Sequence, residues 1–245
     1  MNDPRYTNPY ATPTPASAIG PDATIAVRPD ARTQAAFLTQ AFLWMFAGLA
    51  VTAGIAFVVQ SNVRLLDFTR GAILPLIVFQ LVVVFAIQLG IRRMSATLGL
   101  GLFFIYAASL GLTVGLIVSL YTSASVATAF LSASAMFGAA AVYGHVTKRS
   151  LAGLGGYLVM GVVGLLVASI VNLFLLNSIV SWVISLVGVV IFTALTAFDV
   201  QRIQTGQLVA MTGSVEKAAV MGALHLYLDF VNLFLFLLRL FGNRN

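Results

Sequence analysis

The sequence predicts an all-α integral membrane protein built as a bundle of seven transmembrane helices. Of its 245 residues, 60% are hydrophobic and only 8% are charged, and the mean hydropathy is +1.01. About 25% of the residues of a soluble domain are charged, so this composition excludes that class. The hydrophobic residues fall in blocks of about 20, enough for a helix to cross a hydrocarbon core of about 30 Å. The alternating segments of about 10 residues that mark a membrane barrel are absent.

Residues 1–33 are expected to form a disordered cytoplasmic tail ahead of one transmembrane domain, residues 34–245. The tail holds six of the seven prolines and mixes aspartates with arginines. It therefore cannot bury enough apolar surface to order itself. It also lacks the short apolar core of a cleaved signal peptide.

Seven spans follow the tail in order. Pro75 lies in the first turn of the second span, where a missing N–H is harmless. Gly111 and Gly115 form a GxxxG pattern in the third span, which predicts close packing of helices within the chain. The predicted spans are Gln34–Val59, Ile73–Ile91, Ala96–Tyr121, Ser125–His145, Gly153–Leu176, Val180–Val200 and Ala218–Phe241.

The distribution of basic residues predicts a cytoplasmic N-terminus. In that orientation the cytoplasmic side collects two adjacent basic pairs, at 92–93 and 148–149, whereas two loops on the other side carry no charge. Seven crossings leave Arg239 and Arg244 on the outer side, against this trend. A re-entrant last segment would return them to the cytoplasmic side, and the sequence leaves that alternative open.

The overall charge and the residue counts exclude several functions. The net charge is +6, but no run of basic residues is longer than two, so topology explains the charge better than nucleic-acid binding. The absence of cysteine excludes disulfides and thiolate chemistry, and two histidines disfavour a multi-histidine zinc site. The lipid bilayer is the partner that the composition implies.

The last predicted span carries an aspartate, Asp229, at its centre. A carboxylate there costs roughly 2.5–3.5 kcal/mol on insertion scales, so a specific role must retain it. His225 stands four residues before Asp229 and Asn232 three residues after it. These spacings place the three side chains on one face of the helix, opposite an apolar face.

The natural partner for Asp229 is Asp199, at the cytoplasmic end of the sixth span. Helices joined by a short loop usually pack side by side, so the two carboxyl groups are expected to come within hydrogen-bonding reach. Burial and mutual repulsion disfavour the doubly ionised pair, which would then share a proton and act as a pH-sensitive latch. The depths of the two groups match only if the sixth helix continues through about Gln204, or if residues 215–223 lie along the membrane interface.

Other polar residues near the helix ends have two interpretations. Arg92 and Arg93 are expected to extend toward the headgroups, but either could instead reach inward as the counter-ion of the aspartates. His225 could add a second titrating group near neutral pH. His145 and Asn172 are interpreted as packing or interfacial residues.

Two stretches resemble the C-terminal signatures of the Bax inhibitor-1 family, in a bacterial branch. They are FTALTAFDVQRIQ, which contains Asp199, and ALHLYLDFVNLFLFLLRLFG, which contains Asp229. The resemblance covers everything after the tail. It implies a seven-helix bundle with the last helix at its centre, a location in the bacterial inner membrane, and a pH-dependent calcium leak.

The resemblance also assigns roles to residues. The paired aspartates of the family match Asp199 and Asp229, and its arginine latch matches Arg93, with Arg92 as the alternative register. The sequence departs from the family pattern at Phe198, where a tyrosine is usual, and at His225, where a small residue is usual.

A calcium leak channel gated by the aspartate pair and the arginine is therefore the first hypothesis. Two carboxylates offer at most four of the six to eight oxygens that calcium prefers, so calcium would bind Asp199 and Asp229 weakly, as a permeant ion, with no tightly bound cofactor. The alternative is a non-conducting membrane regulator that modulates a membrane protease or suppresses cell death. An enzyme is not expected, because HExxH, GxSxG and a GxGD context are absent.

Overall fold

A computed structural model gives the structure of this chain and describes residues 31–243. All regular elements in that range are helices, and seven of them are long and apolar enough to cross a membrane, which confirms the predicted fold class. The seven are α1 (Ala31–Gln60), α3 (Ile73–Gly90), α4 (Ala96–Val118), α5 (Ser123–Val146), α6 (Gly155–Leu175), α7 (Ser178–Gln204) and α9 (Val215–Phe241). Two short helices, α2 (Val63–Gly71) and α8 (Gln207–Thr212), and a 3₁₀ turn, η2 (Ala152–Leu154), lie between them.

The predicted tail falls almost wholly outside the described residues. Helix α1 begins at Ala31, three residues before the expected start of the first span at Gln34. The tail itself therefore stays a prediction.

Polar residues placed just before the helices fix where several of them begin. Each accepts a hydrogen bond from a backbone N–H in the first turn, which would otherwise be left without a partner. The capping residues are Asn62 for α2, Ser95 for α4, Thr122 for α5, Asn177 for α7 and Ser214 for α9.

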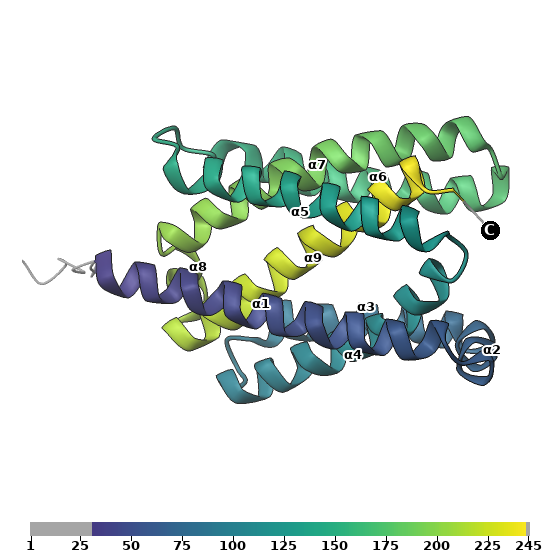
Figure 1. Cartoon of the computed structure of the whole chain (residues 1–245). Helices are drawn as coiled ribbons and strands as arrows, with labels where there is room; N and C mark the ends of the chain where they lie inside the picture. Colours follow the sequence, from purple (N-terminus) through teal and green to yellow (C-terminus); the bar gives the residue numbers. More distant parts are fainter. Residues whose placement is uncertain (1–30, 244–245) are drawn as a thin grey trace, which may run out of the picture.

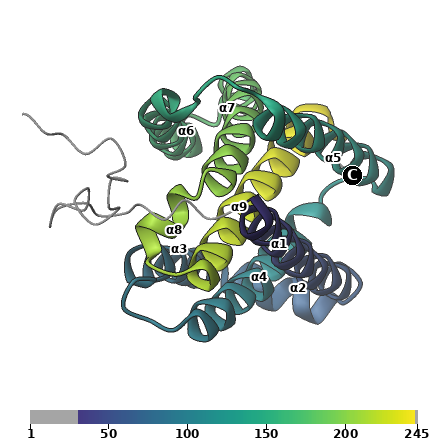
Figure 2. The same cartoon turned by 90° about the vertical axis from the view of Figure 1, so that its left-hand side faces the viewer.

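The last helix, α9, runs through the middle of the bundle. Figure 1 shows it crossing diagonally between α5 and α7 on one side and α1 and α4 on the other, and Figure 2 shows the same arrangement from the end. In the most apolar stretch of 18 residues of α9, 72% is buried, which is more than in any other described span. This confirms the central position that the family resemblance implied.

The same helix is unbroken over 27 residues, and its two ends lie at opposite ends of the bundle. The alternative of a re-entrant last segment therefore does not describe this structure. Arg239 lies near the end of α9 with its guanidinium 6.0 Å from the ring centre of Phe236. Arg244 lies outside the described residues.

Glycines allow the close helix contacts that the sequence predicted. A Cβ added at Gly111 would lie 2.9 Å from the carbonyl oxygen of Thr52, and one at Gly115 would lie 2.9 Å from that of Ala56. Thr52 and Ala56 both lie on α1, so the two glycines of the GxxxG pattern let α4 pack closely against α1 within one chain.

For Asp199 and Asp229 to lie at the same depth, one possibility was that the sixth helix continues through about Gln204, and the structure has this arrangement. Helix α7 continues through Gln204, beyond the end predicted at Val200. Gly206 and Gly213 then take left-handed conformations, with φ of 72° and 81°, on either side of α8. Only glycine adopts this region at little cost, so the two residues fold α8 back between α7 and α9.

Candidate functional site

A cavity of about 510 Å³ lies among α3, α6, α7, α8 and α9, on the side of the bundle that holds α8. Its lining includes both aspartates singled out from the sequence. The structure thus brings Asp199 of α7 and Asp229 of α9 to one place.

The two aspartates are almost fully removed from solvent. Asp199 is 5% exposed and Asp229 is 3% exposed. They lie close enough for their charges to interact. Two carboxylates in such a place cannot easily both be ionised, because each ionised group lacks water and repels the other.

Asp199 has two basic neighbours that meet at the same oxygen. Arg202, one turn later on α7, donates from Nη1 to Oδ1 of Asp199 at 3.2 Å. His225 of α9 places Nδ1 3.4 Å from that oxygen, although the geometry is not that of a hydrogen bond. Protonation of this imidazole would turn the contact into an ion pair between α7 and α9.

Arg202 also makes contacts beyond the aspartate. Its guanidinium lies 5.2 Å from the ring centre of Phe198, and its Nη2 lies 3.2 Å from the sulfur of Met211 on α8. A guanidinium stacked on an aromatic ring and paired with a carboxylate is held in one orientation. Arg202 therefore connects Asp199 to α8.

Asp229 has a different environment. Its Oδ2 is buried and has no hydrogen-bond partner among the described residues. A buried carboxylate oxygen without a donor is costly when it carries charge.

The other two residues of the predicted α9 face also line the cavity. His225 reaches toward Asp199, as described above. Asn232 lines the wall and donates from Nδ2 to the carbonyl oxygen of Leu228 at 2.8 Å. Its amide N–H is thus satisfied on its own helix.

The two candidate arginines point to different places. Arg92 lines the aspartate cavity, and its carbonyl oxygen accepts a hydrogen bond from Lys217 at 3.0 Å. Arg93 lines a separate hollow on the surface of α3. Arg92, the alternative register, therefore lines the aspartate cavity, although among the described residues it forms no ion pair with either aspartate, and Arg93 does not line that cavity.

Two further polar residues lie away from the cavity. His145 is exposed near the end of α5. Asn172 of α6 accepts a hydrogen bond from the backbone N–H of Asn177 at 3.3 Å.

Sequence reasoning missed the role of Arg202 and did not include it among the site residues. The signal was present, because an arginine three residues after an aspartate shares its helical face. It also missed Gln201, whose side chain bonds the backbone N–H of Leu151 at 2.7 Å and the carbonyl oxygen of Arg149 at 2.9 Å. Gln201 thereby fixes the α5–α6 loop to the end of α7.

The cavity offers little for a tightly held metal ion. Among residues 31–243, no group of three or more histidines, cysteines or acidic residues is arranged to hold one. Two carboxylates supply at most four oxygens, and one of these is bonded to Arg202. A calcium ion there would keep most of its water.

Comparison with known proteins gives one consistent result. The model of a protein family described as "Inhibitor of apoptosis-promoting Bax1" matches residues 34–245. The chain is 39% identical over 224 residues to the inner membrane protein YbhL of Escherichia coli strain K12, an alignment that covers 89% of this chain and 95% of that protein. It is 40% identical over 210 residues to an uncharacterized protein of Deinococcus radiodurans, covering 85% and 91% of the two chains. It is 37% identical over 213 residues to an uncharacterized protein of Borreliella burgdorferi, covering 85% and 92%.

Proposed function

The chain belongs to the Bax inhibitor-1 family, and we propose that it is a pH-sensitive cation leak, with calcium as the permeant ion, gated by Asp199 and Asp229. The observation that carries the proposal is the meeting of the two buried carboxylates with Arg202 and His225 in one cavity. Ionisable residues inside a membrane are costly and are retained for ion pathways and proton-linked switches.

The arrangement of the cavities supports a closed resting state. A second cavity, of about 800 Å³, lies at the opposite end of the bundle among α1, α4, α5 and α9. None of the described residues lines both cavities. Asp229 lines one and its neighbour Phe230 lines the other, so α9 itself is the barrier between them.

The proton controls this barrier through the repulsion of the two carboxylates. When the two carboxylates share a proton their repulsion is relieved, and Asp199 stays paired with Arg202 in the closed form. When the shared proton is lost at higher pH, two negative groups face each other and repel. The sign of the effect is therefore a leak that increases with pH.

Arg92 supplies the remaining positive charge at the cavity. The described lining residues from α3 and α6, namely Gln88, Leu89, Val159 and Val162, are not ionisable. Calcium suits this site as a passing ion, because a weakly held and largely hydrated cation can leave as well as enter. No covalent chemistry is part of the proposed role.

The location that fits this role is a bacterial inner membrane, with the N-terminus in the cytoplasm. A relative carries the name inner membrane protein. In Figure 1 the α3–α4 and α5–α6 loops, the end of α7 and the start of α9 lie at the end of the bundle where α1 begins, and these segments carry the basic residues at 92–93, 148–149, Arg202 and Lys217. Basic loops remain on the cytoplasmic side.

The test is flux through the purified full-length protein in liposomes that contain a calcium-sensitive dye, measured over a series of pH values. The wild type should leak more at high pH. Asp199→Asn, Asp229→Asn and the double variant should lose this pH dependence, because an amide neither titrates nor repels. Asp67→Asn is the matched control, since Asp67 is exposed on α2, and it should behave as the wild type.

Gradients of calcium, sodium and protons, compared in the same liposomes, identify the permeant ion. Absence of calcium flux at every pH would overturn the leak and favour a non-conducting regulator, for example of a membrane protease. A pH dependence that survives the double substitution would show that the aspartates are not the switch.

A further inference from the structure

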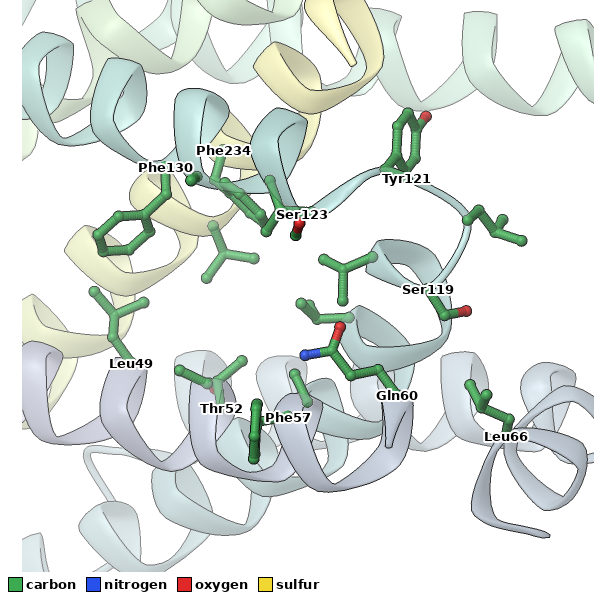
Figure 3. Close-up of a pocket in the computed structure, with 18 of the residues that line it drawn as sticks. Leu49, Thr52, Phe57, Gln60, Leu66, Ser119, Tyr121, Ser123, Phe130 and Phe234 are labelled. Carbon is green, nitrogen blue, oxygen red and sulfur yellow. The ribbon is translucent and has the colours of Figure 1, made fainter. Parts of the chain in front are cut away.

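The cavity at the other end of the bundle has the features of a binding site for an amphiphile. Figure 3 shows it from within, with walls from α1, α4, α5 and α9 and a rim formed by α2. Its volume of about 800 Å³ lies within the range of about 300–1,000 Å³ that is typical of small-molecule sites.

The walls of this cavity are apolar where it is deepest. Leu49, Phe130 and Phe234 lie around its inner part, whereas Gln60 and Ser119 lie nearer to α2 (Figure 3). Thr52 is the exception, but its hydroxyl already bonds Tyr227 and the carbonyl oxygen of Ala107. Water gains little in such a place, because it needs two to four polar partners.

The cavity opens sideways between α1 and α5. Phe57 of α1 and Phe130 of α5 both line it and are 66% and 49% exposed. Both helices are membrane spans, so this opening faces the hydrocarbon layer rather than water. An alkyl chain can therefore enter from the bilayer.

One positive charge stands at the rim. Arg70 of α2 lines the cavity, and the ion pair that it forms with Asp67 is long at 3.7 Å and about two-thirds exposed. An exposed pair of this kind is weak and leaves the guanidinium available to another anion. The side chain of Gln60 projects from the end of α1 into the same cavity (Figure 3).

We propose that this cavity binds a long-chain fatty acid, with the alkyl chain between α1, α5 and α9 and the carboxylate at Arg70 and Gln60. A guanidinium binds a carboxylate through paired N–H groups, and an amide N–H can add a third donor. The proposal does not depend on the leak, because none of its residues lines the aspartate cavity.

The test uses the full-length protein in nanodiscs of phosphatidylcholine. A fatty acid with a photoreactive diazirine in mid-chain is added and irradiated, and the labelled residues are mapped by mass spectrometry. The matching fatty alcohol serves as a probe without charge. The acid should label α1, α5 and α9 around the cavity, and the alcohol should label them less.

Two pairs of variants test binding of the carboxylate separately from binding of the alkyl chain. Arg70→Gln should lower labelling by the acid about two- to fivefold, the effect of one exposed charge contact, and should leave labelling by the alcohol unchanged. Arg64→Gln, on the same helix but outside the cavity lining, is its control. Ala127→Phe should fill the opening and abolish labelling by both probes, whereas Ala124→Phe, on the same helix and outside the lining, should not.

Ala53→Phe fills the opening from α1 and repeats the test if Ala127→Phe does not fold. Equal labelling by acid and alcohol, or labelling spread over the lipid-facing surface in spite of the filled cavity, would overturn the proposal. The first result would mean that ordinary lipid tails occupy the cavity, and the second that it binds nothing.

Discussion

Gly144 of α5 packs directly on the backbone of α7, and replacing it by alanine is expected to destabilise the bundle. A Cβ at this position would overlap the carbonyl oxygen of Ala197 and would lie 2.9 Å from both its carbonyl carbon and its Cα. These are backbone atoms inside a long helix, so they cannot rotate away as a side chain would. The two helices must separate or shift along each other.

Gly138, on the same helix, is the matched control. A Cβ added there meets no atom within 4 Å. Both substitutions replace glycine by alanine inside α5, and alanine is the better helix former by about 0.8–1 kcal/mol in each case. This gain cancels when the two variants are compared, so the difference in their free energy of unfolding isolates the steric cost.

That cost is expected to be about 1–3 kcal/mol, the usual result of overpacking a close contact. The measurement is unfolding of each purified variant in detergent, followed by circular dichroism over a temperature range or over added sodium dodecyl sulfate. Gly138→Ala should be as stable as the wild type or slightly more stable. Gly144→Ala should unfold first.

A second readout connects this contact to the site. Ala197 precedes Asp199 by two residues on α7, so a shift of α7 moves that carboxylate relative to Asp229. Gly144→Ala should therefore alter the pH dependence of the leak, and Gly138→Ala should not. If the two variants unfold together, the close approach of α5 and α7 is wrong, and with it the placement of Asp199.

Two further predictions concern the arginines. Arg202→Gln removes the positive charge that stabilises ionised Asp199, so the rise of flux should move to higher pH, and Arg202→Lys should restore part of the shift; an unchanged curve would contradict the role of the 3.2 Å contact. Arg92→Gln should shift the same curve and Arg93→Gln should leave it in place, since only Arg92 lines the aspartate cavity. The reverse result would restore Arg93 as the latch.

Much of the fold could be predicted from the sequence because the chain spans a membrane. A helix must satisfy its own backbone groups and span about 30 Å of hydrocarbon, so each apolar block had one possible structure. The predicted third span begins at Ala96, as α4 does, and the predicted last span ends at Phe241, as α9 does. The end that moved most is that of the sixth span, where α7 continues past the apolar block from Val200 to Gln204.

The candidate site could be predicted only in part. The spacing of His225, Asp229 and Asn232 placed them on one face because helical periodicity is local. Arg202 was not identified as the partner of Asp199, although it stands three residues later on the same helical face and its spacing could be read from the sequence. Whether Arg92 or Arg93 lines the aspartate cavity depends on how the α3–α4 loop is placed against α7 and α9, which the spacing of residues does not determine.

The amino-acid sequence alone determined the number of spans, their order and the presence of two acidic groups in an apolar setting, since hydropathy and helical spacing are properties of neighbouring residues. Only the tertiary structure decided that Arg202 and His225 meet at one oxygen of Asp199. It also decided that an apolar cavity with Arg70 at its rim lies at the far end of α9. Both depend on side chains from more than one helix, and the tilt and rotation that bring those side chains together are set by packing over the whole bundle.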